Sequence, residues 1–223
     1  NTKEFVHSFC HCIPKTWHHM SVMLSATNCI NWISKMFNLN INDSMRIIEN
    51  FSKNNFEDKT TPYFLPYLSG ERTPHNNAYI RGSFHLLDTS VNPDVLLYSV
   101  LEGVSFGIKD GFEAVHSVSS KKDKIYLVGG GSKNSFWTDL LASLLNQPIS
   151  IGEDANLGPA LGAARLAMLA TKDYHIKEVM KNMKIVKDCS ISNNLSERLD
   201  KRYKIWKEIV NINLPIAKTL MEK

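Results

Sequence analysis

The sequence predicts an α/β fold in which strands alternate with helices. In the last third of the chain, an apolar strand at 124–128 leads into a helix from about residue 134 to residue 145. A second strand at 148–151 then precedes a helix from about residue 158 to residue 170. Strands that alternate with helices favour layers of helix packed on sheet. The chain has 223 residues, 43% of them hydrophobic, which suffices for one large domain with its own core.

The first part of the chain predicts a β-hairpin followed by a helix. Residues 5–12 alternate as a strand does, Pro14 lies in a turn, and residues 17–22 return as the second strand. Apolar residues then recur at helical spacing between residues 24 and 37, which indicates an amphipathic helix.

The next segment predicts a second helix, a short strand and a long loop. Asp43 or Ser44 is expected to cap the helix, which ends near Phe51. Residues 63–65 form a short apolar strand, and residues 66–82 contain turn residues without a regular period. Loops of this length in compact domains usually carry function or move.

Two long helices complete the predicted elements. Asn92 and Pro93 make a cap followed by a proline in the first turn, so they begin a helix that extends to about Val118. A helix over residues 195–220 closes the chain. Its aromatic residues at helical spacing suggest either a core face or a surface for a partner, and we prefer the core face.

Composition and charge exclude several classes of function. The formal net charge is +4, and no run of five or six like charges points to nucleic acid or to a membrane surface. No apolar run approaches the roughly 18 residues of a membrane span, and no leader is apparent. Four cysteines do not form a disulfide framework in so long a chain, so we expect the reducing cytoplasm. A chain that opens with Asn1 close to a strand suggests a piece of a longer protein.

Three consecutive glycines, Gly129, Gly130 and Gly131, are the most informative local feature. They lie between an apolar strand, expected to be buried, and a helix, where main chain without Cβ atoms can approach a ligand. The N-terminus of the following helix would favour a nucleotide. The pattern is neither GxGxxG nor a Walker loop. A tight turn without a ligand explains the glycines equally well.

Gly158 and Gly162 form a second small-residue site, four residues apart in a predicted helix. Such spacing indicates that another main chain or a flat ligand lies close to the helix face. Close packing of the helix on the sheet is the preferred interpretation.

A cluster of histidines and cysteines in the hairpin suggests zinc, but its spacing is poor for a metal site. Cys10 and Cys12 share one face of a strand and His11 lies on the other. No Cys-x₂₋₄-Cys pairs with a His-x₃₋₅-His. We therefore interpret the hairpin as structural and predict no metal site.

Several motifs together resemble xylulokinases, in the carbohydrate kinase family that includes glycerol kinase. The specific signature is Pro-Tyr-Leu-Ser-Gly-Glu-Arg-Thr-Pro-His at 66–75, followed by Arg-Gly-Ser-Phe at 81–84. Further motifs occur in the family's order, at residues 7–11, 17–20, 23–26, 101–107, 129–131 and 158–164. The resemblance is weakest after Lys172. Two positions depart from it: Leu86 replaces an expected glycine, and Val95 replaces an expected acidic or amide residue.

The resemblance implies a ribonuclease H/actin-like ATPase domain, with a mixed sheet flanked by helices. Residues 1–223 would be the C-terminal, nucleotide-binding domain of a two-domain kinase, without its opening strands. The family's catalytic aspartate, its Gly-Thr-Ser-type phosphate loop and most sugar contacts lie upstream, so no catalytic residue is expected in this chain.

The resemblance also implies which residues contact ATP. In glycerol kinase-like enzymes, the helix after the hairpin contacts the nucleotide from two positions one turn apart, and the glycine loop lies near the adenine and ribose. The implied nucleotide-binding residues are Thr27, Asn31, Gly129, Gly130, Gly131 and Asn134.

Glu71 and Arg72, in the signature loop, admit three interpretations. They could serve as a catalytic acid and a phosphate clamp. The resemblance favours a loop ion pair, or an element that faces the cleft between the domains.

The resulting hypothesis is ATP-dependent phosphorylation of a ketopentose with Mg²⁺, preferably of D-xylulose at its 5-hydroxyl. We expect the isolated chain to be inactive and the intact enzyme to be cytoplasmic, and a homodimer is one assembly that the sequence permits. One alternative is a kinase of the same family that acts on ribulose, glycerol or gluconate. Another is a non-catalytic actin-like nucleotide-binding or scaffold module.

Overall fold

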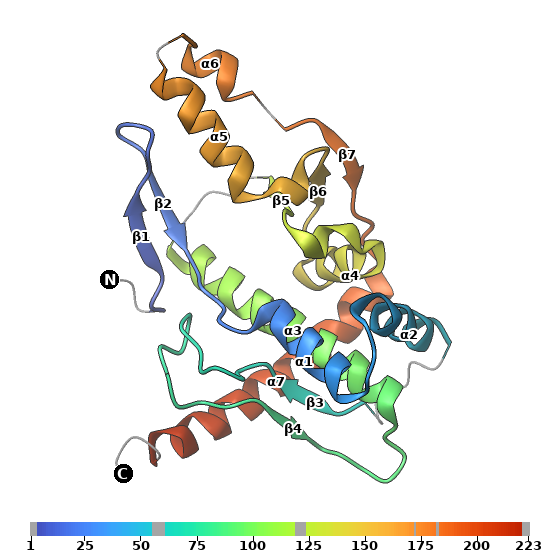
Figure 1. Ribbon diagram of the computed structural model, residues 1–223. Coiled ribbons are helices and arrows are strands. Elements are labelled where there is room, and N and C mark those ends of the chain that lie inside the picture. Colours follow the sequence, from blue (N-terminus) through green and yellow to red (C-terminus); the bar gives the residue numbers. More distant parts are fainter. Residues whose placement is uncertain (1–3, 55–60, 119–123, 172, 182, 220–223) are drawn as a thin grey trace. The chain divides into compact units, whose positions relative to one another are not determined.

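The computed structural model of the chain describes all residues except 1–3, 55–60, 119–123, 172, 182 and 220–223 (Figure 1). Its contacts divide the chain into two compact units. Unit 1 contains residues 1–121 and 197–223, and unit 2 contains residues 122–196. Each unit is described by itself.

Unit 1 begins with the expected hairpin. Strand β1, His7–Cys10, pairs antiparallel with strand β2, Trp17–Met20, and Phe9 lies opposite His18. Most side chains of both strands are exposed.

Two helices follow the hairpin. Helix α1, Ala26–Met36, is confirmed and buries Cys29, Ile30, Ile33 and Ser34. Helix α2, Ile41–Asn54, begins earlier than expected.

Asn40 caps α2, so the prediction that Asp43 or Ser44 does so is wrong. The Asn40 side-chain oxygen accepts a hydrogen bond from the Asp43 main-chain N–H at 2.9 Å, and the Asn40 carbonyl accepts from the Ser44 N–H. Asp43 lies in the first turn, where a carboxylate is favourable near the unpaired N–H groups.

The predicted strand at 63–65 is present, but it has a partner that the sequence analysis missed. Strand β3, Tyr63–Leu65, pairs antiparallel with strand β4, Ser83–His85, and Phe64 lies opposite Phe84. The long loop at 66–82 joins the two strands. All three residues of β3 are buried.

Helix α3, Pro93–Val118, confirms the cap at Asn92 and forms the centre of unit 1. The Asn92 side-chain oxygen accepts hydrogen bonds from the N–H groups of Asp94 and Val95, at 3.0 and 3.1 Å. Val95 is 6% exposed, so the position where an acidic or amide residue was expected packs into the core instead. Fifteen residues of α3 are buried, which fits a helix surrounded by other elements.

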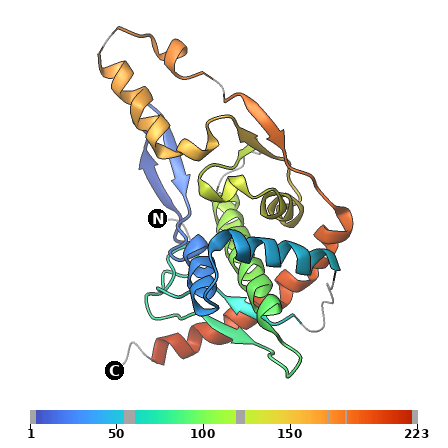
Figure 2. The same cartoon turned by 45° about the vertical axis from the view of Figure 1, so that its right-hand side comes forward.

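Helix α7, Asn193–Thr219, lies mostly in unit 1 and packs beside α3 (Figure 2). Trp206 is fully buried, and its indole N–H donates to the Phe64 carbonyl at 2.9 Å. The buried Arg202 guanidinium contacts the Glu102 carboxylate at 2.7 Å. The core interpretation of this helix is therefore confirmed, whereas its expected end at residue 220 lies outside the described residues.

Unit 2 contains a mixed sheet of three strands. Strand β5, Ile125–Tyr126, pairs in parallel with strand β6, Ile149–Gly152, which pairs antiparallel with strand β7, Ile185–Asp188. The prediction of a buried strand over 124–128 is wrong in extent and in burial, because Tyr126 is 43% exposed. The reason is that β5 is an edge strand, paired on one side.

The helices of unit 2 differ in burial. Helix α4, Ser135–Leu145, buries seven residues. Helix α5, Pro159–Ala170, buries none, and a Cβ atom at Gly162 would meet no atom within 4 Å. The expected close packing at Gly162 is therefore wrong for this structure, since no neighbour approaches it. Although α5 is apolar, no helix in the described part of the chain is long and apolar enough to cross a membrane.

Short elements complete unit 2. Two 3₁₀ turns, Gly130–Lys133 and Ala155–Leu157, follow β5 and β6. Helix α6, Ile176–Val179, and strand β7 were missed because each is only four residues long.

Leu86 has a φ of +60° and is 71% exposed, which explains why a glycine was expected there. The left-handed region costs an L-residue roughly 1–2 kcal/mol. Glycine enters it freely but loses about 0.4–1 kcal/mol more entropy on folding. Leu86→Gly should therefore stabilise unit 1 by about 0.5–1 kcal/mol in urea unfolding followed by tryptophan fluorescence. The exposed Leu87, whose φ is not positive, is the control, and Leu87→Gly should destabilise. If the two substitutions change the free energy of unfolding equally, the backbone at Leu86 is not strained.

The buried Arg202–Glu102 pair should contribute far more to stability than an exposed pair on the same helix. Arg202→Met leaves the charge of a carboxylate that is 1% exposed poorly compensated, so unfolding should become easier by about 3–5 kcal/mol. Lys204→Met breaks the exposed 2.8 Å contact with Asp200 and should cost less than about 1 kcal/mol. Urea unfolding measures both, and similar losses would show that burial is not decisive.

Candidate functional site

The candidate site in unit 2 consists of two loops at one edge of the sheet. Because β5 and β6 are parallel, the loops at 127–134 and 153–158 both leave from carboxyl ends of strands. Ligands of open α/β sheets bind outside this edge. The Gly129 N–H donates to the Ala155 carbonyl at 2.7 Å, which joins the two loops directly.

Gly129 gives the glycine loop its shape. Its φ of +94° with ψ of −175° is a conformation that side chains strongly disfavour. Its carbonyl accepts hydrogen bonds from the N–H and the hydroxyl of Ser132, at 3.2 and 2.7 Å. Ser132 is buried, so this turn is fixed from within the protein.

The other two glycines have different surroundings. A Cβ atom on Gly131 would lie 2.9 Å from the Trp137 ring, so packing alone accounts for that glycine. Gly130 is exposed, and a Cβ atom there would meet nothing within 4 Å. Neither packing nor a positive φ requires glycine at position 130. The open space beside its main chain is where a ligand could approach.

Asn134 has a structural role of its own. Its side-chain oxygen accepts a hydrogen bond from the Trp137 N–H at 2.8 Å and so caps helix α4. The Nδ2 amide group is then the part of this side chain that remains for a ligand. The structure brings Asn134 together with the glycine loop, at the N-terminus of α4.

Thr27 and Asn31 lie on the exposed side of α1 in unit 1, one helical turn apart. This spacing places their side chains on the same helix face. The structure therefore brings these two residues together, separately from the glycine loop of unit 2.

Glu71 is buried inside the signature loop, with 4% of its surface exposed. One carboxylate oxygen, Oε1, accepts hydrogen bonds from the main-chain N–H groups of Leu24, at 3.0 Å, and Arg72, at 2.8 Å. Burial raises the pKa of Glu71, although the two N–H donors act in the opposite direction.

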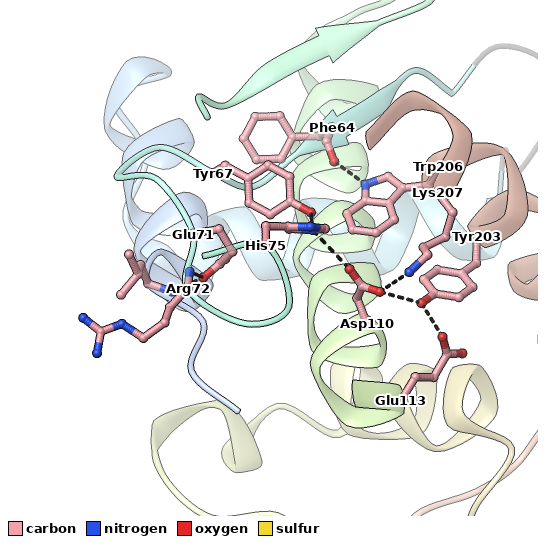
Figure 3. Close-up of polar contacts among 11 residues, drawn as sticks. Phe64, Tyr67, Glu71, Arg72, His75, Asp110, Glu113, Tyr203, Trp206 and Lys207 are labelled. Carbon is pink, nitrogen blue, oxygen red and sulfur yellow. Dashed lines mark hydrogen bonds and ion pairs between the residues drawn. The ribbon is translucent and has the colours of Figure 1, made fainter. Parts of the chain in front are cut away.

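Of the interpretations of Glu71 and Arg72, the ion pair between them is wrong. Among the described residues no ion pair joins them, and the exposed Arg72 guanidinium points away from the Glu71 carboxylate (Figure 3). The reason is that the carboxylate is occupied by main-chain N–H groups. That Arg72 faces a cleft stays a prediction.

A buried polar cluster behind the loop was missed by the sequence analysis. His75 Nε2 lies 3.0 Å from the Tyr67 hydroxyl and 3.3 Å from Asp110 Oδ2 (Figure 3). The other Asp110 oxygen contacts Lys207 and accepts a hydrogen bond from the Tyr203 hydroxyl. Burial alone would raise the pKa of Asp110, but the contacts with His75 and Lys207 outweigh it and hold the pKa below its ordinary value. An aspartate among the apolar residues of α3 was the available signal.

The hairpin histidines and cysteines make local contacts. The Ser8 hydroxyl lies 2.8 Å from His19 Nδ1, and Cys12 Sγ lies 3.4 Å from His11 Nδ1. Within the described ranges, no three His, Cys, Asp or Glu side chains are grouped to hold a metal ion.

Comparison with known proteins places the chain in a family. Residues 1–171 match the C-terminal domain of the FGGY family of carbohydrate kinases. The chain belongs to this family. The match ends where the sequence resemblance weakens.

Relatives and solved structures agree with the family match. A xylulose kinase from Escherichia coli is 42% identical over 165 residues, or 74% of this chain and 34% of the relative. One from Lactococcus lactis is 29% identical, over 99% of this chain and 44% of the relative. The crystal structure of a xylulose kinase from Brucella ovis superposes with a TM-score of 0.83 at 34% identity, over 95% of this chain and 44% of that one. The expected ribonuclease H/actin-like fold of this FGGY domain is thereby confirmed, and the chain spans 34% to 44% of the length of these relatives.

The lowered pKa of Asp110 predicts a pH-dependent contribution to stability. Its stabilisation is fully present above the ordinary carboxyl pKa, near 4, and is lost as the pH falls through the lower folded value. Asp110→Asn should lower the free energy of unfolding at pH 7 by about 1–3 kcal/mol, and the difference should narrow below about pH 4. Glu49→Gln, which removes the charge of a half-buried carboxylate of α2, should change the free energy of unfolding by at most about 0.5 kcal/mol. A difference independent of pH would contradict this account.

Proposed function

We propose that this chain is the ATP-binding part of a sugar kinase that phosphorylates a ketopentose, D-xylulose, at its 5-hydroxyl. The observation that carries the proposal is the open space beside Gly130, at the carboxyl edge of the sheet and the start of α4. The carboxyl edge of the strands is where ligands of open α/β sheets bind, and main chain without a Cβ atom lets an adenosine approach closely. The printed names of the relatives, xylulose kinase in each case, support the choice of sugar.

Each proposed contact has a distinct part in holding ATP. Gly129 sets the turn, Gly130 lets the main chain approach the adenosine, and Gly131 keeps Trp137 packed beneath the loop. The Asn134 amide donates to the nucleotide while its oxygen caps α4. Thr27 and Asn31 provide hydrogen-bonding groups on the exposed face of α1.

The remaining chemistry is assigned to the part of the enzyme outside this chain. Phosphoryl transfer needs in-line positioning and neutralisation of the charge on the phosphoryl oxygens, with Mg²⁺ bound to the phosphates. The described residues offer no acidic cluster for a metal, so we place no Mg²⁺ ligand among them. The catalytic aspartate is expected upstream, and the chain alone is expected not to catalyse the reaction.

Gly130→Leu in the full-length kinase tests the proposal. A Cβ atom at this position meets nothing within 4 Å, so we expect the fold to be kept while the leucine side chain occupies the space proposed for ATP. The KM for ATP should rise at least about tenfold, equivalent to about 1.4 kcal/mol. The KM for D-xylulose should stay within about twofold in the same coupled assay.

Asn146→Gly is the matched control. Asn146 has a φ of +49° at the far end of α4, where glycine is well tolerated, so the KM for ATP should not change. An unchanged KM for ATP in Gly130→Leu would overturn the nucleotide site. Faster turnover of ribulose, glycerol or gluconate than of D-xylulose would instead overturn only the choice of sugar.

A further inference from the structure

We propose that Glu71 is a positioning residue, which holds the start of α1 and thereby the Thr27–Asn31 face in the geometry that contacts the nucleotide. This inference rests on the proposed function of that face. It assigns Glu71 no contact with substrate, since the side chain is 4% exposed and bonded to main chain.

The signature loop is hydrogen-bonded to the segment that leads into α1. Glu71 Oε1 accepts from Leu24 N–H at 3.0 Å. Thr73 and Val22 form two further hydrogen bonds, Thr73 N–H to Val22 O at 3.1 Å and Val22 N–H to Thr73 Oγ1 at 3.2 Å. The Ser69 N–H also donates to Ser25 Oγ at 3.2 Å, and Cys29 Sγ donates to the Pro66 carbonyl at 3.3 Å. The loop therefore supports the first turns of α1 from outside the helix.

Helix α1 depends on this support because its own cap is weak. Ser25 occupies the N-cap position, but its side chain makes no capping hydrogen bond within the helix. Its hydroxyl accepts from Ser69 in the loop instead. The bonds from the loop to Leu24 and Ser25 therefore hold the chain at the point where it enters the helix.

Glu71 is the strongest of these anchors. A single buried carboxylate oxygen bonds the N–H of Leu24, two residues before α1, and the N–H of Arg72 in the loop. The 3.0 Å bond to Leu24 is shorter than the other hydrogen bonds given above between the two segments, which measure 3.1 to 3.3 Å. The loop backbone beneath is closed by paired hydrogen bonds between Glu71 and Asn77, at 2.8 and 2.9 Å. The anchor is thus rigid at both ends.

The anchor determines where the side chains of Thr27 and Asn31 lie. Thr27 is the second residue of α1 and Asn31 lies one turn further, so a shift of the helix start displaces both exposed side chains together. Affinity and rate are sensitive to displacements of about 1 Å in groups that position a substrate. Removal of the anchor should weaken ATP binding and leave the sugar site unaffected.

Two substitutions of Glu71 in the full-length kinase separate the acceptor from the charge. Glu71→Gln keeps an oxygen that accepts from both N–H groups, so its KM for ATP should stay within about threefold of the parent. Glu71→Met keeps the length and apolar volume but removes the acceptor, so its KM for ATP should rise about tenfold. The KM for D-xylulose and kcat at saturating ATP should change less than about threefold in both. A residue with a merely structural role would not raise the KM for ATP while leaving the KM for D-xylulose and kcat unchanged.

Val210→Ala in α7 is the control for lost stability, because it removes buried volume from unit 1 and leaves the hydrogen-bonding groups of the loop and of the segment before α1 in place. Its KM for ATP should remain that of the parent below the unfolding temperature. If Glu71→Met does not fold, Ser25→Ala tests the same anchor, and its KM for ATP should rise about threefold. If the KM for ATP is unchanged in Glu71→Met, or in Ser25→Ala where Glu71→Met does not fold, the inference is wrong.

Asn31→Ala distinguishes the inference from the function on which it rests. If Asn31→Ala and Gly130→Leu raise the KM for ATP but Glu71→Met does not, the positioning role is wrong and the nucleotide site stands. If none of the three changes it, the nucleotide site itself is wrong. If Glu71→Gln behaves like Glu71→Met, the charge and not the acceptor geometry is responsible, and the proposed mechanism fails.

Discussion

The fold of unit 1 depends on one buried ion pair. The Arg202 guanidinium binds both oxygens of Glu102, at 2.7 to 3.0 Å, and also donates to the Thr61 carbonyl at 3.1 Å. Its flat face lies 4.3 Å from the centre of the Tyr63 ring. One side chain thereby joins the last helix, the central helix and the entry to β3, which are far apart in the sequence. Because a charge in the core is costly unless all its partners are present, this arrangement is satisfied by a single packing of the three elements.

The interior carboxylates of unit 1 follow the same principle. Glu71, Glu102 and Asp110 are each at most 4% exposed, and each is bonded to groups from a distant segment. Such polar groups specify which elements meet, whereas apolar contacts alone tolerate many packings. The signature loop therefore has an evident structural function, besides any contact with substrate, in joining β3 to the start of α1.

Local patterns predicted much of the fold. The hairpin, α1, α3 and the glycine turn before α4 depend on alternation, helical spacing, the Asn92 cap and glycine, all of which act over a few residues. Strands β4 and β7 were missed because they are three and four residues long and owe their pairing to a distant strand. The burial expected for β5 failed for the opposite reason, since an apolar run does not reveal whether a second neighbour is present. Likewise, the apolar composition of α5 does not reveal whether another element covers the helix.

The sequence predicted which residues form the candidate site, but not the hydrogen bonds that those residues make. The family resemblance selected Thr27, Asn31 and Gly130, which lie on exposed surface as a binding role requires. It could not show that Asn134 also caps α4, or that the Glu71 carboxylate bonds main-chain N–H groups instead of the Arg72 guanidinium. Both facts depend on backbone geometry. The contact of His75 with Asp110 joins residues 35 positions apart, and only the packed structure brings them together.

The exposure of α5 affects how any oligomer of this chain should be interpreted. Leu166 and Met168 are each 39% exposed, and Leu157 just before the helix is 46% exposed. Exposed apolar side chains on a helix that buries none of its residues favour self-association in water. A dimer of the 223-residue chain in gel filtration would therefore not by itself show the subunit arrangement of the intact kinase.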